Sequence, residues 1–279
     1  MPSGQRAAPT EQRAVAPDSA TALLAPDEPA PVAVHNAGGA APVLLLCDHA
    51  CHFVPRALDN LGLPPADLER HIAYDIGILP IAKTLSDALD APLIQTHFSR
   101  LIVDPNRQLD DATLMPEIAD GTIVAGNRHL APDHVTARLE TFFWPYHRTV
   151  ADWVQHLRAQ GPPPVVICLH SFTAEMHGRR RPWEVGVLWE SDARLPVPAM
   201  DWLAARGYCV GDNEPYSARG RHGYTQHVHA ERLGLANILI ELRQDLIGDA
   251  AGQRFWAAEM TAMFRTLLAD PSLYHARPR

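Results

Sequence analysis

Polar side chains that can bind a metal ion stand directly after two apolar runs of the chain. Residues 48–52 (Asp-His-Ala-Cys-His) follow one run, and His170 follows another. Zinc in hydrolytic sites usually takes three protein ligands from His and carboxylate side chains, and it leaves a fourth position for water or substrate. The His-x-x-His pair of His49 and His52, together with the distant His170, supplies such a set. The pattern therefore predicts a hydrolase that binds one zinc ion.

These side chains also have structural interpretations. The chain contains 15 His residues, and a single His after a strand is often structural. That alternative stays open for His52, whereas metal binding is favoured for His49 and His170 because both follow apolar runs. Cys47 and Cys51 flank the turn without the spacing of a zinc knuckle, so we interpret them as small buried residues.

Glu241 lies inside the apolar run at residues 236–242. Burial disfavours the charged form of a carboxyl group and raises its pKa toward neutrality, which suits a general base. Glu241 is therefore the candidate catalytic residue, and Arg243, two residues further on, is a candidate for substrate binding. The alternative is that Glu241 is a buried ion-pair partner of Arg243 or Arg100.

Residues 99–107 (Ser-Arg-Leu-Ile-Val-Asp-Pro-Asn-Arg) contain two arginines and an asparagine. A guanidinium group matches a carboxylate with two parallel hydrogen bonds, and an Asn side chain can hold an amide. Arg100, Asn106 and Arg107 are therefore candidate residues for binding a substrate carboxylate. The alternative is a structural pairing of an arginine with Asp104.

The chain has one local basic run, which consists of three arginines at residues 179–181. A run of like charges is typical of a solvated surface. We therefore predict that these arginines lie on a mobile loop over the cleft.

The candidate residues need a scaffold that brings strand ends together. Short continuous apolar runs are typical of strands buried on both faces of a parallel sheet, and the segments between them carry the apolar period of helices. The predicted strands are residues 43–47, 92–96, 165–169, 185–189 and 236–242, and the predicted helices begin at 64 and span 77–89, 136–157, 198–206 and 250–268. This alternation predicts an α/β fold with a mostly parallel or mixed central sheet flanked by helices. Ligands bind beyond the carboxyl ends of such strands, which is where the motifs fall.

The first 40 residues differ from the rest, because they are rich in Ala and Pro and show no apolar period. Such a segment buries too little surface to offset the entropy lost on ordering it. We predict a flexible arm at residues 1–40, with a short strand at residues 31–34, and a single hydrolase domain at residues 41–279.

The composition of the chain limits which binding partners and which cellular compartment are expected. A net charge of −8 argues against a nucleic-acid surface, which needs clustered Lys and Arg. No apolar stretch approaches the roughly 20 residues of a membrane span, and the N-terminus lacks the pattern of a secretory signal. Four Cys in 279 residues do not form a disulfide framework, so a cytoplasmic location is expected.

Six segments, taken in order, resemble the N-formylglutamate amidohydrolase family. They are Cys47-Asp48-His49-Ala50, Tyr74-Asp75-Ile76-Gly77, Ser99-Arg100 through Asn106-Arg107, Leu169-His170-Ser171-Phe172-Thr173, Asn213-Glu214-Pro215-Tyr216-Ser217 and Ile240 through Leu246. The resemblance covers nearly everything after the arm. It implies a phosphorylase/hydrolase-like α/β fold and a relation to zinc carboxypeptidases and aspartoacylase-like deacylases.

The resemblance also implies roles and a reaction. The roles are zinc binding by His49 and His170, proton transfer by Glu241, and a carboxylate clamp at Arg100, Asn106 and Arg107. Related enzymes carry a Glu where this chain has His52. The implied reaction is hydrolysis of an acidic N-acyl amino acid, such as N-formyl-L-glutamate to formate and glutamate in histidine degradation. The alternatives are a deacylase or carboxypeptidase-like hydrolase of another acidic amide, and a metal-free carboxylate-binding protein. The acyl group and the oligomeric state stay open.

Overall fold

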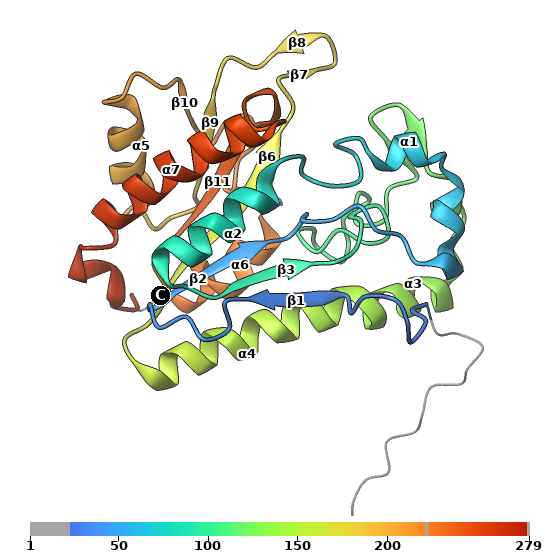
Figure 1. The fold of residues 1–279 in the computed structure, drawn as a ribbon. Coiled ribbons are helices and arrows are strands. Elements are labelled where there is room, and N and C mark those ends of the chain that lie inside the picture. Colours follow the sequence, from blue (N-terminus) through green and yellow to red (C-terminus); the bar gives the residue numbers. More distant parts are fainter. Residues whose placement is uncertain (1–22, 221–222, 278–279) are drawn as a thin grey trace, which may run out of the picture.

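The computed structural model describes residues 23–220 and 223–277, which fold around a central seven-stranded sheet (Figure 1). In spatial order its strands are β1 (Val32–His35), β3 (Leu93–Thr96), β2 (Val43–Cys47), β6 (Val165–Phe172), β11 (Asn237–Arg243), β9 (Val185–Leu188) and β10 (Val210–Asp212). The neighbours β3, β2, β6 and β11 are parallel, whereas β1 and β9 run antiparallel to β3 and β11. The predicted α/β class with a mostly parallel, mixed sheet is confirmed.

Helices cover both faces of the sheet. They are α2 (Ile78–Leu89), α5 (Pro196–Ala204) and α7 (Ala250–Leu267) on one face, and α4 (Trp144–Gln160) and α6 (Tyr224–His229) on the other. In β2, Val43 and Leu45 pack into the first core and Leu44 and Leu46 into the second, because successive side chains of a strand point to opposite faces. Both faces are buried, which explains the continuous apolar run. None of the helices in the described part of the chain has the length and apolar character to cross a membrane.

The predicted long helix at residues 136–157 lies within one continuous helical stretch, for which we expected a bend near Pro145. In the structure α3 (Pro132–Arg138) passes into a π-helical turn at 139–143 and then into α4, and the residues at both junctions have helical backbone angles. The irregular turn therefore lies just ahead of Pro145, whose missing N–H group cannot bond within a regular helix.

A lobe of turns and short helices lies beyond the carboxyl ends of the parallel strands, at the right of Figure 1. It contains α1 (Pro65–Leu68) and the hairpin of β4 (Ile118–Ala119) and β5 (Thr122–Ile123), and it has a separate apolar core. Arg138 is buried there and donates to the carbonyl oxygens of Ile102 and Gly126. This contact fixes the backbone beside the predicted carboxylate clamp.

The predicted N-terminal arm is described only in part, because residues 1–22 lie outside the described residues. The predicted strand in the arm corresponds to β1, which pairs antiparallel with β3 at the edge of the central sheet. Val32 and Val34 pack against the core beside α4. The described end of the arm therefore contributes to the sheet, and a flexible segment stays a prediction for residues 1–22.

Candidate active site

The strand register brings three predicted site residues to one edge of the sheet. His170 on β6 pairs with Glu241 on β11, and Leu46 on β2 pairs with Cys168 on β6. His49 follows β2 by two residues, so it reaches the same edge as His170 and Glu241. All three side chains are buried, with exposed fractions of 7 % or less.

His49, Asp75 and His170 form a compact cluster of possible metal ligands. His170 Nδ1 lies 3.2 Å from His49 Nδ1 and 3.0 Å from Asp75 Oδ2, and His49 Nδ1 lies 3.3 Å from Asp75 Oδ2. In a tetrahedral site with zinc–ligand bonds of 2.0–2.1 Å, neighbouring ligand atoms stand roughly 3.3 Å apart. Two imidazole nitrogens and a carboxylate oxygen are also a donor set that zinc uses. The residues present therefore fit a zinc ion.

The outer nitrogen of each imidazole faces a carboxylate. His49 Nε2 lies 2.7 Å from Asp104 Oδ1, and His170 Nε2 lies 3.3 Å from Asp48 Oδ2. Asp48 also accepts a hydrogen bond from the Tyr146 hydroxyl. Metal-binding His residues commonly donate their second N–H to a carboxylate, which fixes the tautomer and leaves the inner nitrogen free for the metal. His49 is held in that way, whereas Asp48 faces Nε2 of His170 without a hydrogen bond.

The charges of the buried side chains around the cluster also favour a bound cation. Asp48, Asp75 and Asp104 are all buried, and Arg100 is the guanidinium group that pairs with them, through Asp104 and Asp75. With neutral imidazoles this leaves two negative charges in excess, which a divalent cation would neutralise. Without a cation, burial lowers the pKa of His170 but the adjacent Asp48 and Asp75 carboxylates outweigh it and raise that pKa well above its usual value. In the metal-free protein a proton on His170 therefore supplies part of the positive charge that a metal ion would supply.

Asp75 was not among the ligands that we predicted. It stands just before α2, where its backbone N–H donates to the His49 carbonyl oxygen and its Oδ2 accepts from the Ser171 N–H. Gly77 then starts α2 at φ 81°, and a Cβ there would lie 2.2 Å from the Ile247 carbonyl oxygen. The chain leaves β2 at the carboxyl edge of the sheet and returns to the parallel strand β3 through α2, so α2 must begin at that edge. This rule of topology could have identified Asp75, the acidic residue just before α2, from the sequence.

Glu241 lies beside this cluster and forms no salt bridge with the described part of the chain. Burial raises its pKa to about 7, and its Oε2 has no hydrogen-bond partner among the described residues. Arg100 and Arg243, the two alternative partners, pair with Asp104 and Asp245 instead. A carboxyl group with a pKa near neutrality and a free oxygen can exchange a proton with a bound water or substrate.

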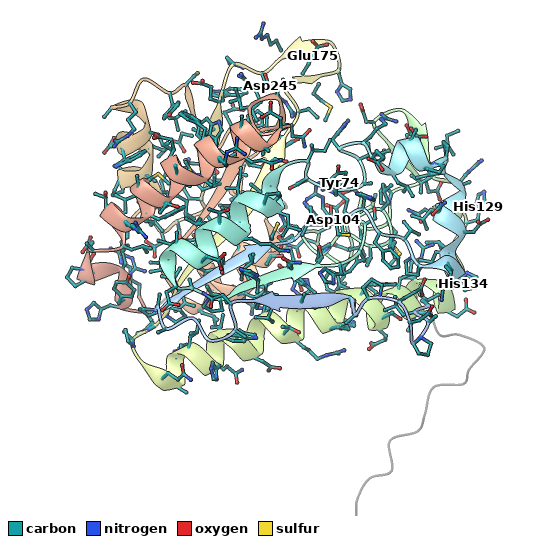
Figure 2. The ribbon with its side chains drawn as sticks, in the orientation of Figure 1. Tyr74, Asp104, His129, His134, Glu175 and Asp245 are labelled. Carbon is teal, nitrogen blue, oxygen red and sulfur yellow. The ribbon has the colours of Figure 1, made fainter. Side chains whose placement is uncertain are left out.

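The cluster opens on a cavity of about 390 Å³. The ionisable side chains around it include His49, Asp75, Arg100, Asp104, His170 and Glu241. Figure 2 shows Asp104 and Tyr74 between the central sheet and the lobe that carries α1. The cavity therefore lies at the carboxyl edge, where an α/β sheet is expected to bind its ligand.

Arg107 and Asn106 also line the cavity. Arg107 donates to the Thr113 hydroxyl and to the Asn106 carbonyl oxygen, which are both neutral. Its positive charge therefore remains available for a carboxylate. For Arg100 the alternative of a structural pairing with Asp104 applies, because its guanidinium group donates to Asp104 and Asp75.

Two predicted site residues are not brought to the cavity. His52 packs the edge of its ring against Tyr74, with the ring centroids 4.8 Å apart, and it is not part of the metal cluster. The backbone is not helical here, so the His-x-x-His spacing does not place both rings on one face. Arg243 donates to Asp245 and to the carbonyl oxygens of residues 181–183, and it holds that backbone in place.

The turn at residues 213–217 brings Tyr216 to the cavity wall. Asn213 Oδ1 accepts hydrogen bonds from the Trp189 and Ala218 N–H groups, so the turn is fixed at both of its ends. On β9, Gly186 pairs with Glu241 and passes close beneath this turn. A Cβ added to Gly186 would lie 2.2 Å from the Glu214 carbonyl oxygen and 3.3 Å from the Glu241 Cβ.

Gly186→Ala should therefore both destabilise the protein and lower its activity. We expect a loss of about 1–3 kcal/mol in the free energy of unfolding, which is typical of overpacking, because the backbone of the turn has to shift. Chemical denaturation with an activity assay measures both effects. Gly38→Ala is the control, because nothing lies within 4 Å of the added atom. Equal stability of the two variants would contradict the close approach.

Comparison with solved structures supports this architecture. The chain matches the crystal structure of gene product Atu2144 from Agrobacterium tumefaciens with 32% identity and a TM-score of 0.86, over 88% of this chain and 98% of that one. It also matches the N-formylglutamate amidohydrolase from Ralstonia eutropha JMP134 with 19% identity and a TM-score of 0.65, over 86% of this chain and 98% of that one. The second likeness shows the shared fold. A search of curated proteins found no match.

A family model gives the clearest assignment. The model for N-formylglutamate amidohydrolase matches residues 41–248, a span that contains all three predicted His ligands, Asp75, the clamp and Glu241. The match covers most of the chain and agrees with the resemblance of the six sequence segments. The chain belongs to the N-formylglutamate amidohydrolase family.

Proposed function

We propose that the protein is a zinc-dependent amidohydrolase that cleaves a short acidic N-acyl amino acid, typified by N-formyl-L-glutamate, to formate and glutamate. The observation that carries the proposal is the geometry of His49, Asp75 and His170, whose ligand atoms stand 3.0–3.3 Å apart beside a buried Glu241. Membership of the amidohydrolase family supports the reaction type.

The chain's residues divide the work of hydrolysis. A zinc ion, when bound, would polarise the acyl oxygen and lower the pKa of water. Glu241 accepts a proton from the water whose hydroxyl adds to the acyl carbon, and it delivers that proton to the amine nitrogen as the C–N bond breaks. Asp104 keeps the His49 imidazole in the tautomer that leaves Nδ1 free, and the Asp48 carboxylate beside His170 Nε2 favours the same tautomer of His170. Arg107 binds the substrate carboxylate and so orients the amide.

The second candidate is a deacylase of another acidic amide, which the same residues would serve. The cavity of about 390 Å³ favours keeping it, because N-formylglutamate has only 12 non-hydrogen atoms and the cavity also has space for a larger acyl group. A metal-free binding protein is disfavoured, because it would leave Arg100 and a proton on His170 to offset the three buried carboxylates Asp48, Asp75 and Asp104.

Release of formate and of free amino acid from a panel of N-formyl and N-acetyl amino acids tests the proposal. We expect turnover of N-formyl-L-glutamate, loss of activity after chelation and recovery on addition of Zn²⁺, because the ligand cluster should hold the ion reversibly. Preference for the N-acetyl compounds would support the second candidate. No release from any compound by zinc-loaded protein, or activity that survives complete chelation, would show the proposal to be wrong.

A further inference from the structure

Arg181 differs from its two neighbours in the run of three arginines. Arg179 and Arg180 are exposed on β8 (Arg179–Arg180), which forms a hairpin with β7 (Glu175–Met176), whereas Arg181 is partly buried at the base of this β7–β8 hairpin. Its Nη1 donates to the Tyr216 hydroxyl at 3.1 Å and to the Thr173 hydroxyl at 3.2 Å. Tyr216 and Thr173 both line the cavity. The predicted solvated surface therefore applies to Arg179 and Arg180, whereas Arg181 contacts two residues of the cavity wall.

The charge of Arg181 has no counterion among the described residues. Its Nη1 partners are hydroxyl and carbonyl oxygens, and its Nε and Nη2 have no hydrogen-bond partner in the described part of the chain. Its charge nevertheless reaches the cavity: burial lowers the pKa of His71, which lines the cavity, and Arg181 is among the cations that lower it further. A partly buried guanidinium group without a counterion is suited to an anionic ligand.

The backbone around Arg181 is fixed. Its N–H donates to the Ala174 carbonyl oxygen at 2.8 Å, which closes the hairpin. Arg243 donates to the carbonyl oxygens of Arg181, Pro182 and Trp183. In Figure 2, Asp245, the carboxylate partner of Arg243, lies directly below the hairpin that carries Glu175. The arginine is therefore held before a ligand arrives, which reduces the entropy that binding costs.

Two arginines at this site have no carboxylate partner among the described residues: Arg107 lines the cavity, and Arg181 contacts its wall. Arg107 follows Asp104 by three residues, and against burial its charge joins those of Arg100 and His49 in lowering the Asp104 pKa. It therefore lies close to the metal cluster. Arg181 acts on the cavity wall at Tyr216, in the β7–β8 region.

We propose that Arg181 is a specificity-determining residue that binds the side-chain carboxylate of an acidic N-acyl amino acid, while Arg107 binds the α-carboxylate. The α-carboxylate sits one carbon from the amide nitrogen and so needs the cation nearer the cluster. The side-chain carboxylate of a glutamate is separated from that nitrogen by three carbons, so it is assigned to Arg181, the cation beside Tyr216. This assignment rests on the proposed function.

Steady-state kinetics on three compounds of nearly equal shape test the assignment: N-formyl-L-glutamate, N-formyl-L-glutamine and N-formyl-L-isoglutamine. Arg181→Gln should lower the ratio of kcat/KM for glutamate over glutamine by about 10- to 100-fold, the usual effect of a charge-assisted hydrogen bond. Its ratio for glutamate over isoglutamine should not change. Arg107→Gln should show the reverse pattern, Arg181→Lys should keep part of the discrimination, and Arg179→Gln, on the same hairpin, should behave as the wild type.

The outcomes separate the inference from the proposed function. If Arg181→Gln lowers kcat/KM equally for all three compounds, Arg181 only holds Tyr216 in place and the inference is wrong. If the wild type hydrolyses none of them, the proposed function is wrong. Calorimetric titration with N-formyl-L-glutamate and N-formyl-L-glutamine then still judges Arg181: equal effects of Arg181→Gln on the two affinities overturn the inference, and a selective loss for glutamate supports it.

Discussion

Glu241→Gln is expected to lower kcat by a factor on the order of 100 to 10,000, which is the usual contribution of a general acid–base group. Gln has nearly the same shape, so the cavity and the carboxylate-binding arginines are preserved, and KM should change little. Zinc content should also stay the same, because Glu241 is not one of the three clustered ligands. Kinetics on zinc-loaded protein together with metal analysis measure these effects.

The same substitution should stabilise the metal-free protein at alkaline pH. Burial raises the pKa of Glu241 from its usual 4.5 to about 7. Below pH 4.5 the carboxyl group is protonated in both the folded and unfolded states, so its titration does not make the stability depend on pH. Between pH 4.5 and 7 the unfolded state loses its proton first, and the stability contributed by the protonated folded form declines. Glu241→Gln avoids this decline.

Thermal unfolding against pH measures the second effect. The advantage of Glu241→Gln should grow from pH 4.5 to 7 and reach on the order of 3 kcal/mol above that range, from the size of the pKa difference. The protein must be metal-free, because a bound cation would lower the pKa of Glu241. Glu69→Gln, at an exposed position, is the matched control. If Glu241→Gln and Glu69→Gln show the same dependence of stability on pH, the carboxyl group of Glu241 is not buried in its protonated form. If they also have the same kcat, Glu241 is not the general base.

The scaffold of the site could be predicted from the sequence because it depends on strand ends. Continuous apolar runs identify strands that are buried on both faces, and their carboxyl ends meet at one edge. His49, His170 and Glu241 each stand at such an end, and the register of β2, β6 and β11 brings them together. The positions follow from local pattern and sheet topology alone.

The rest of the site depends on contacts that the local pattern does not contain. Asp75 reaches the cluster because the chain after β2 folds back and begins α2 at the same edge. His52 lies close to His49 in sequence, yet its ring turns toward Tyr74. Arg243 is two residues from Glu241, but a returning loop supplies the carbonyl groups that it binds. Spacing along the chain therefore does not predict the role of a residue whose contacts come from a loop distant in sequence.

The identity of the third metal ligand has the second large expected effect. The sequence predicts His49, His52 and His170, whereas the structure clusters His49, Asp75 and His170. We expect the wild type to bind one zinc ion per chain, and Asp75→Asn and His170→Ala to weaken zinc binding by more than about 100-fold, since even residues behind the ligands contribute 10- to 100-fold. His52→Ala should retain wild-type affinity, because its ring is not directed to the cluster.

Competition with a chelator of known affinity gives the zinc dissociation constants, and the shift of Tm with added zinc gives an independent measure. Asp75→Asn also removes a buried carboxylate that pairs with Arg100 and His170, so the metal-free variant should be less stable than the metal-free wild type. The gain of Tm from zinc is therefore measured for each variant against its own metal-free form, which separates lost zinc binding from lost stability. Retained affinity in Asp75→Asn combined with lost affinity in His52→Ala would reverse the assignment and restore the three-histidine site. No zinc binding by the wild type would remove the metal from the proposed mechanism.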